Sequence, residues 1–335
     1  MKPRMTFGLL YDFRNPEQWW KPWPELYADT LDFIAWTEKI GFDGAWLPEH
    51  HFADDGYLPS PLIVLSAVAA RTKEIKLGSA ISIAPLYHPV RFAEDCALLD
   101  IISNGRLEMH IGVGARECET AGFGVSFKAR GNLTDEFLQI VRKLWAGEVV
   151  NHDGRHFSIK NARIMPRPLK GRVPLYIGGF TDKAIRRAVT YGDGLSGPVE
   201  LCESYLKMMG ESGSKAAPLR LRSFDMYLYV AADPARAWAE LAPHVLYANN
   251  AYAKMYSEEK ADFGNLALKP MSMEEFTASG KLRVLTPLQA IGQFESILAV
   301  APIEHFMIYA PAGLPLARFA EYVDLFAREV IPAFR

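Results

Sequence analysis

Short apolar runs alternate with longer amphipathic stretches along most of the chain. The runs have the length and composition of buried strands, and they lie at 5–10, 43–47, 75–79, 107–113, 173–177, just after Gly194, 219–231 and 303–309. The stretches between them carry apolar residues at helical spacing, over 24–40, 60–71, 89–102, 133–145, 183–191, 287–298 and 316–330. The repeated order of strand and then helix predicts a parallel sheet.

A parallel sheet of this kind is either a closed barrel or an open, doubly wound sheet. Eight candidate strands favour the closed barrel. An open sheet that binds a dinucleotide also needs a G-x-G-x-x-G turn after its first strand, and no such turn follows Leu10. We therefore predict an α/β chain that forms a single (β/α)8 TIM barrel domain over residues 1–335, with insertions after its strands. The least regular stretch, about 232–285, is expected to be an insertion with its own helices.

Composition agrees with one large barrel and limits the kinds of partner that the chain is expected to bind. The 335 residues accommodate a barrel of roughly 250 residues plus insertions. Half of them are hydrophobic, which is enough to build one large core. The formal net charge is −2 and no basic run occurs, so we expect neither nucleic acid nor a membrane surface as a partner.

Cysteine usage and the apolar runs indicate a cytoplasmic protein. Cys96, Cys118 and Cys202 are odd in number and far apart, which supports neither a disulfide framework nor a cysteine metal site. The apolar run at 5–11 is too short for the core of a signal peptide. The longest apolar run, about 61–70, is far below the roughly 20 residues that cross a bilayer.

Two adjacent histidines follow the second predicted strand, in the sequence Glu49-His50-His51-Phe52. Functional residues of a barrel cluster in the loops after its strands, and a neutral imidazole exchanges protons near pH 7. A purely structural pair, with one buried and one exposed ring, fits the same spacing. Metal binding is disfavoured, because neighbouring side chains on extended backbone point to opposite faces.

Small residues and glycines follow three other predicted strands. After the third strand, small residues around Ala80 and Ile81 allow a flat ligand to approach the backbone. The fourth strand leads into Gly112, Gly114 and Arg116, a combination that can hold an anion. The strand at 173–177 leads into a glycine turn that opens a helix, which is a natural phosphate cradle or simply a tight turn with a threonine cap, formed by Gly178, Gly179, Phe180 and Thr181. Together they predict a flat, phosphorylated cofactor.

These segments, in this order, resemble the bacterial-luciferase-like family of flavin-dependent monooxygenases. The most specific pieces are Glu49-His50-His51-Phe52 and the stretch 88–114, which includes Ser103-Asn104-Gly105-Arg106. Further pieces lie at 123–125, 130–131, 144–145, 174–179 and 326–332. The resemblance covers nearly the whole chain and weakens between about 232 and 285.

The resemblance implies roles for the candidate residues. FMN would lie across the carboxyl ends of the strands, over a non-proline cis peptide at Ala80-Ile81. The turn from Gly178 to Thr181 would hold its phosphate, helped by Arg116, which stands one position after the arginine of many relatives. His50, rather than His51, would face the flavin and hydrogen-bond the oxygenated cofactor or move a proton during oxygen transfer.

The resemblance also implies an activity and partners. Reduced FMN, supplied by a separate flavin reductase, would react with dioxygen to oxidise a small organic substrate, and the chain would form a homodimer. Apart from the resemblance, the aromatic-rich loop after the first strand either walls an apolar substrate pocket or only seals the barrel mouth (Phe13, Trp19, Trp20 and Trp23). The alternatives are hydride transfer with a deazaflavin coenzyme on the same fold, a non-catalytic flavin-binding protein, and a metal-dependent hydrolase.

Overall fold

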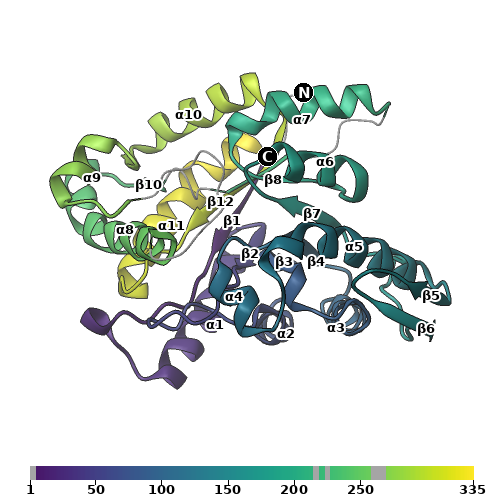
Figure 1. Cartoon of the computed structure of the whole chain (residues 1–335). Helices are drawn as coiled ribbons and strands as arrows, with labels where there is room; N and C mark the ends of the chain where they lie inside the picture. The colour runs from purple at the N-terminus through teal and green to yellow at the C-terminus, as the bar shows by residue number, and fades with distance from the viewer. Residues whose placement is uncertain (1–4, 214–218, 223–226, 258–268) are drawn as a thin grey trace.

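Eight strands form a closed barrel in which all neighbouring strands are parallel (Figure 1). The structure is a computed structural model that describes residues 5–213, 219–222, 227–257 and 269–335. Around the barrel the strands are β1 (Thr6–Leu10), β2 (Gly44–Leu47), β3 (Lys76–Ile83), β4 (Leu107–Gly112), β7 (Leu175–Gly178), β8 (Gly194–Ser196), β9 (Leu219–Arg222) and β12 (Ile303–Tyr309). The predicted TIM barrel is confirmed.

Helices surround the barrel and bury their apolar faces against it (Figure 1). Phe7 of β1, for example, makes edge-to-face contacts with Phe294 and Phe326 on two of these helices, with ring centroids 5.2 and 5.1 Å apart. The covering helices are α1 (Trp23–Lys39), α2 (Pro61–Arg71), α3 (Pro89–Ile102), α5 (Arg130–Ala146), α6 (Asp182–Tyr191), α7 (Cys202–Glu211), α10 (Pro287–Val300) and α11 (Leu316–Glu329). A short helix, α4 (Glu117–Gly122), follows β4, and an antiparallel hairpin of β5 (Val150–Asp153) and β6 (Ser158–Ala162) follows α5.

Side chains fill the inside of the barrel. Trp46 of β2 donates from Nε1 to Nε2 of His305 on β12 over 2.7 Å, and Nδ1 of His305 lies 2.7 Å from the hydroxyl of Thr6. Burial, and then the charge of Arg220, hold the pKa of His305 well below its ordinary value, so this ring is neutral. Arg220 pairs with Glu108 at 3.3 Å. A packed interior of this kind directs ligands to the strand ends.

Two strand predictions differ from the structure. The apolar segment 219–231 divides into β9, in the barrel, and β10 (Tyr227–Val230), which pairs with β11 (Leu282–Leu285) in a separate two-stranded parallel sheet. The hydroxyl of Tyr229 on β10 donates to the carbonyl oxygen of Tyr309, which attaches this small sheet to the end of β12. Strand β3 runs to Ile83 instead of ending near 79.

The stretch predicted as an insertion contains a long helix. Helix α8 (Pro234–Ser257) and the shorter α9 (Met273–Ser279) lie within it, while residues 258–268 lie outside the described residues. Helix α9 begins with a capping box, in which Ser272 accepts from the amide of Glu275 and Glu275 accepts from the amide of Ser272. Helix α8 lies beside β11 and α9 (Figure 1).

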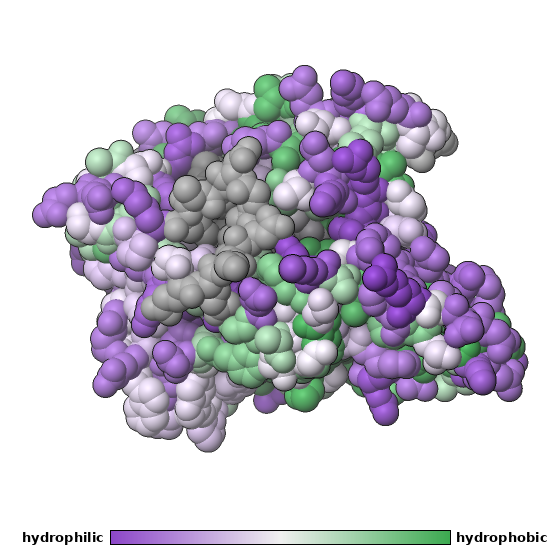
Figure 2. All heavy atoms as spheres, in the orientation of Figure 1, coloured by the Kyte–Doolittle hydropathy of each residue, from purple (hydrophilic) through white to green (hydrophobic). Residues whose placement is uncertain are grey.

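The surface is largely hydrophilic on the face drawn in Figure 2. The exposed large hydrophobic side chains include Trp20, Ile63, Met165 and Leu288, and also Phe52 and Phe123, whose rings lie together. Within the described ranges, the helices are too short or too polar to cross a membrane.

The close pairing of β3 with β4 makes Gly78 a sensitive position. A Cβ at Gly78 would overlap the backbone carbonyl of Glu108 on the neighbouring strand. We expect Gly78→Ala to lower the free energy of unfolding by about 1–3 kcal/mol, as overpacking usually does. Gly292→Ala is the control, because nothing lies within 4 Å of its Cβ in α10 and alanine favours a helix by about 0.5–1 kcal/mol. Urea unfolding measures both; equal stability of the two variants would contradict the strand packing described here.

Candidate active site

A cavity of about 550 Å³ opens at the carboxyl ends of the barrel strands. Its wall includes residues that follow β2, β3, β4 and β7, together with residues of α5, α6 and α8. Residues proposed from the sequence lie on it together: His50, Ala80, Ile81, Gly114, Gly178, Gly179, Phe180 and Thr181. Gly112 and Arg116 do not belong to its described wall.

The floor of the cavity is the end of β3. Ala80, Ile81 and Ile83 line it, and the peptide bond between Ala80 and Ile81 is cis, as the family resemblance implies. A Cβ at Gly112 would overlap the end of the Ile81 side chain, and one at Gly178 would lie 2.5 Å from its Cγ2. The two glycines on neighbouring strands therefore make space for Ile81. Gly112 acts on the cavity through this packing and not as an anion ligand.

The turn from β7 into α6 forms one end of the cavity. Gly178, Gly179 and Phe180 lead to Thr181, whose hydroxyl oxygen accepts from the amide of Ala184 over 3.4 Å and caps the helix. The first amides of α6 have no partners within the helix, and the helix dipole favours negative charge here. A Cβ at Gly179 would lie 2.5 Å from the Cβ of Ala184, so only glycine allows this close turn. This end can hold a phosphate.

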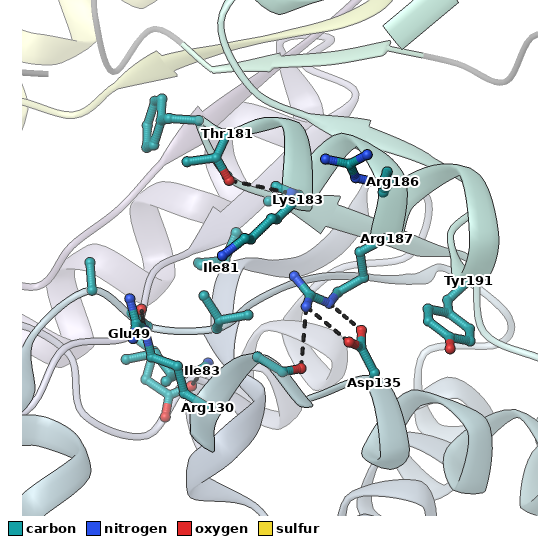
Figure 3. A pocket seen from close by; sticks show the side chains of 18 of the residues that line it. Glu49, Ile81, Ile83, Arg130, Asp135, Thr181, Lys183, Arg186, Arg187 and Tyr191 are labelled. Atoms are coloured by element: carbon teal, nitrogen blue, oxygen red, sulfur yellow. Dashed lines mark hydrogen bonds and ion pairs between the residues drawn. The ribbon is translucent and has the colours of Figure 1, made fainter. Parts of the chain in front are cut away.

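Basic side chains are frequent on the cavity wall. Figure 3 shows Lys183 extending from α6 toward the floor and Arg187 reaching Asp135 of α5, with Nε 2.6 Å from Oδ1. The cationic residues of the wall are Lys128, Arg130, Lys183, Arg186 and Arg187. Asp135 and Glu49 are its acidic members, so the wall carries a net positive charge that suits an anionic ligand. The sequence held a signal for this set, since positions 183, 186 and 187 share one face of a helix.

His50 lies at the other end, held by partners on both ring nitrogens. Its Nδ1 is 2.9 Å from Oε1 of Glu119 in α4, and its Nε2 is 3.0 Å from the hydroxyl of Tyr252 in α8. Tyr252 also bonds the hydroxyl of Tyr57 at 2.9 Å. The sequence did not predict these three partners, because Glu119 and Tyr252 lie 69 and 202 positions along the chain from His50 and Tyr57 reaches the group only through Tyr252.

The carboxylate of Glu119 is ionised by its surroundings. Burial alone would raise its pKa, but the charge and hydrogen bond of His50, the amide of His51 and the charge of Arg116 lower it below its ordinary value. Arg116 also donates to the carbonyl oxygen of His51 over 2.8 Å and pairs with Glu119 at 3.3 Å. Arg116 therefore holds the loop that carries His50 and His51. It is not on the described cavity wall, whereas the sequence hypothesis placed it near the phosphate of the cofactor.

His51 has a separate carboxylate and a different position. Its Nε2 lies 3.0 Å from Oε1 of Glu49, while Oε2 of Glu49 accepts from the amide of Ile83 and from the hydroxyl of Tyr87. Burial raises the pKa of Glu49 above its ordinary value. Because Glu49 ties His51 to the end of β3, His51 is a structural residue and His50 is the histidine that lines the cavity.

Neither the tryptophans nor a metal cluster belongs to this site. Trp19 stacks on His244 of α8 with centroids 4.0 Å apart, and none of the three tryptophans is on the described cavity wall. Their expected role in walling a substrate pocket is therefore not what the structure shows. Over the described part of the chain, no three His, Cys, Asp or Glu side chains gather as metal ligands would.

Comparison with known proteins identifies the family. A family model described as luciferase-like monooxygenase matches residues 5–307. The chain belongs to the luciferase-like monooxygenase family. The resemblance found in the sequence is thus confirmed, and the family is one of oxidoreductases.

Full-length relatives within the luciferase-like family use two kinds of cofactor. The chain is 22% identical over 326 residues to the oxygenase component of the flavin-dependent trigonelline monooxygenase of Acinetobacter baylyi, with 92% of this chain and 90% of that one covered. It is 26% identical over 328 residues to the F420-dependent glucose-6-phosphate dehydrogenase of Amycolatopsis mediterranei, covering 92% and 94%.

Other comparisons support the fold. The crystal structure of monooxygenase RslO1 from Streptomyces bottropensis superimposes with a TM-score of 0.85, 22% identity and coverage of 99% of this chain and 100% of that one. Two uncharacterised relatives from Sinorhizobium fredii are 34% and 33% identical, over 51% and 59% of this chain. The chain spans only about half of their length, 49% and 58% respectively.

The lowered pKa of Glu119 predicts a pH-dependent contribution to stability. In the folded protein Glu119 binds a proton less tightly than it does in the unfolded chain. Ionised Glu119 therefore stabilises the fold fully above its ordinary pKa of about 4.3. That stabilisation is lost as the pH falls below this value and through the lower pKa of the folded state. Glu119→Gln should cost about 1–3 kcal/mol near pH 6 and less near pH 3.5. Urea unfolding at both pH values measures the difference.

The control for this measurement is Glu329→Gln, which changes an exposed carboxylate at the end of α11. Its effect on stability should be small at both pH values. If the loss of unfolding free energy in Glu119→Gln is the same at about pH 6 and pH 3.5, the electrostatic account of Glu119 and His50 is contradicted.

Proposed function

We propose that this chain is the oxygenase component of a two-component monooxygenase, which uses reduced FMN and dioxygen to oxidise a small organic substrate. The observation that carries the proposal is one cavity whose wall holds both the glycine turn at the start of α6 and a hydrogen-bonded histidine. The trigonelline monooxygenase relative is itself named an oxygenase component, which supports a separate flavin reductase as the partner that supplies reduced FMN.

The residues of the cavity fit FMN. Ala80 and Ile81 offer an apolar floor for a flat ring system, and the volume of about 550 Å³ suits a ligand of this size. The amides from Gly178 to Thr181 and the ammonium of Lys183 would hold the phosphate. When bound there, reduced FMN supplies the redox chemistry with dioxygen, which no side chain of the protein performs.

The protein's own residues supply orientation and proton control. The carboxylate of Glu119 fixes the ring of His50 by accepting from Nδ1, as a triad carboxylate fixes its histidine. Buried aromatic residues Tyr57, Tyr252 and Tyr256 close this end of the cavity and reduce the access of water. His50 can hold or release a proton beside the ligand.

A second candidate function is hydride transfer with a deazaflavin coenzyme. Relatives of similar coverage are F420-dependent dehydrogenases. The cationic wall also continues beyond the phosphate cradle along α6, through Arg186 and Arg187 to Thr190 and Tyr191, and so offers contacts beyond one phosphate. Reduced FMN and reduced coenzyme F420 therefore have to be compared directly.

The test is an anaerobic titration of the protein with each reduced cofactor, followed by mixing with oxygenated buffer. We expect reduced FMN to bind more tightly and hydrogen peroxide to be released slowly from the complex. His50→Ala should keep most of the affinity but release peroxide about tenfold faster or more, because general acid–base groups contribute about 10²–10⁴ in rate. Preferred binding of reduced F420 would favour the second candidate. Binding of reduced FMN followed by rapid release of hydrogen peroxide from the wild type would favour a flavin carrier.

The phosphate cradle has a test of its own. Gly179→Ala brings a methyl group against Ala184 and should displace the turn that presents the amides. We expect it to weaken binding of FMN at least about tenfold and binding of riboflavin much less, since riboflavin lacks the phosphate. Gly210→Ala in α7, where nothing lies within 4 Å of the Cβ, is the control. Equal losses of affinity for both ligands would mean that this turn does not bind the phosphate.

A further inference from the structure

Both ring nitrogens of His50 have a hydrogen-bond partner. Glu119 holds Nδ1 and Tyr252 holds Nε2, at 2.9 and 3.0 Å. The His50 side chain is only 13% exposed. Tyr252 lines the same cavity as His50 and belongs to helix α8, in the stretch where the family resemblance is weakest. A ligand in the cavity therefore meets His50 together with the hydroxyl of Tyr252.

The hydrogen bonds of this group have a direction that follows from charge. Oε1 of Glu119 accepts from the amide of His51 and from Arg116, which can only donate, so it is a carboxylate oxygen that also accepts from Nδ1 of His50. In the neutral ring Nε2 is then the acceptor, and the hydroxyl of Tyr252 is the donor. Because Tyr252 has one hydroxyl proton and gives it to His50, its oxygen accepts from the hydroxyl of Tyr57. The order of donation is Tyr57 to Tyr252 to His50 to Glu119.

We propose that Tyr252 is the group of the cavity that exchanges a proton with the ligand. His50 acts through Tyr252 as the base, and Glu119 stabilises the protonated His50 ring. In the forward step a proton leaves an acidic group of the ligand for Oη of Tyr252, while the hydroxyl proton of Tyr252 passes to Nε2 of His50. The ring becomes an imidazolium that Glu119 neutralises, and no electron is transferred. The reverse step returns the proton to the ligand.

The surroundings of Tyr252 support negative charge on its oxygen during this exchange. The guanidinium of Arg14 lies 4.1 Å from the ring centroid of Tyr57 and 5.3 Å from that of Tyr252. Arg14 is buried and is held there by Asp12 and Asp55, at 3.2 and 2.5 Å. Burial raises the pKa of Tyr57 well above its ordinary value, so Tyr57 remains a hydrogen-bond donor to Tyr252. A buried cation thus lies beside the ring of Tyr252, and a hydrogen-bond donor faces its oxygen.

This inference rests on the proposed function for its ligand, but the hydrogen-bond order exists without one. Nitrogen-15 NMR of the cofactor-free protein reads that order, with His50 assigned by the loss of its signals in His50→Gln. Near pH 8 we expect the tautomer with the proton on Nδ1. Tyr252→Phe should move the Nε2 resonance toward that of an imine nitrogen without a hydrogen bond. The opposite tautomer in the wild type would overturn the proposal.

The control variant is Tyr322→Phe. The hydroxyl of Tyr322 in α11 donates to Glu240 of α8, so this change also removes a hydroxyl contact of that helix but lies away from the cavity. It should leave the His50 resonances in place. If Tyr322→Phe moves them as much as Tyr252→Phe does, the effect comes from loosening of α8 and the proposal fails.

The second experiment measures peroxide release from the complex with reduced FMN after oxygen is admitted. Tyr252→Phe should speed release as much as His50→Ala, about tenfold or more, and the double variant should be no faster, because the two residues act as one unit. Rapid release in His50→Ala but not in Tyr252→Phe would mean that His50 acts directly, which overturns the proposal. Failure of the wild type to bind reduced FMN would instead reject the proposed function, while the NMR result stands.

Discussion

The packed interior of the barrel is the constraint from which the site follows. Trp46 donates to His305, and Arg220 bonds Tyr176 and pairs with Glu108, so these side chains at the centre already have partners. Replacing those partners by a ligand would leave buried polar groups unpaired, at a cost of about 1–3 kcal/mol each. The cavity accordingly lies at the rim, where backbone amides and loop side chains line it.

Two carboxylates organise the rim by each holding one histidine. Glu49 secures His51 to the end of β3 through the amide of Ile83, and Glu119 secures His50 against α4. The two adjacent histidines are divided in this way: His51 is tied to the end of β3 and His50 lines the cavity. Because a carboxylate that accepts from a histidine also decides which nitrogen carries the proton, Glu119 determines the protonation pattern that the cavity experiences.

The cavity is polarised from end to end. The amides at the start of α6 and the basic side chains around them attract an anion to one end, while ionised Glu119 and the tyrosines lie at the other. A long, flat ligand with a single anionic terminus has only one favourable orientation in such a field. Under the proposed function, the uncharged ring of such a ligand would lie beside His50 and Tyr252. The insertion contributes directly, since α8 supplies Tyr252 and Tyr256 to the wall.

Local patterns in the sequence predicted the barrel, the glycine turn at the start of α6 and His50, because strand and helix periodicity and strand-end glycines are properties of neighbouring residues. The split of 219–231 was not predicted, since whether an apolar strand joins the barrel or pairs with β11 depends on a partner over fifty residues away. The same holds for Glu119 and Tyr252, which meet His50 only after the barrel closes. Arg116 shows the limit most clearly: its sequence position matched an anion site, but burial beside Glu119 gave it a supporting role.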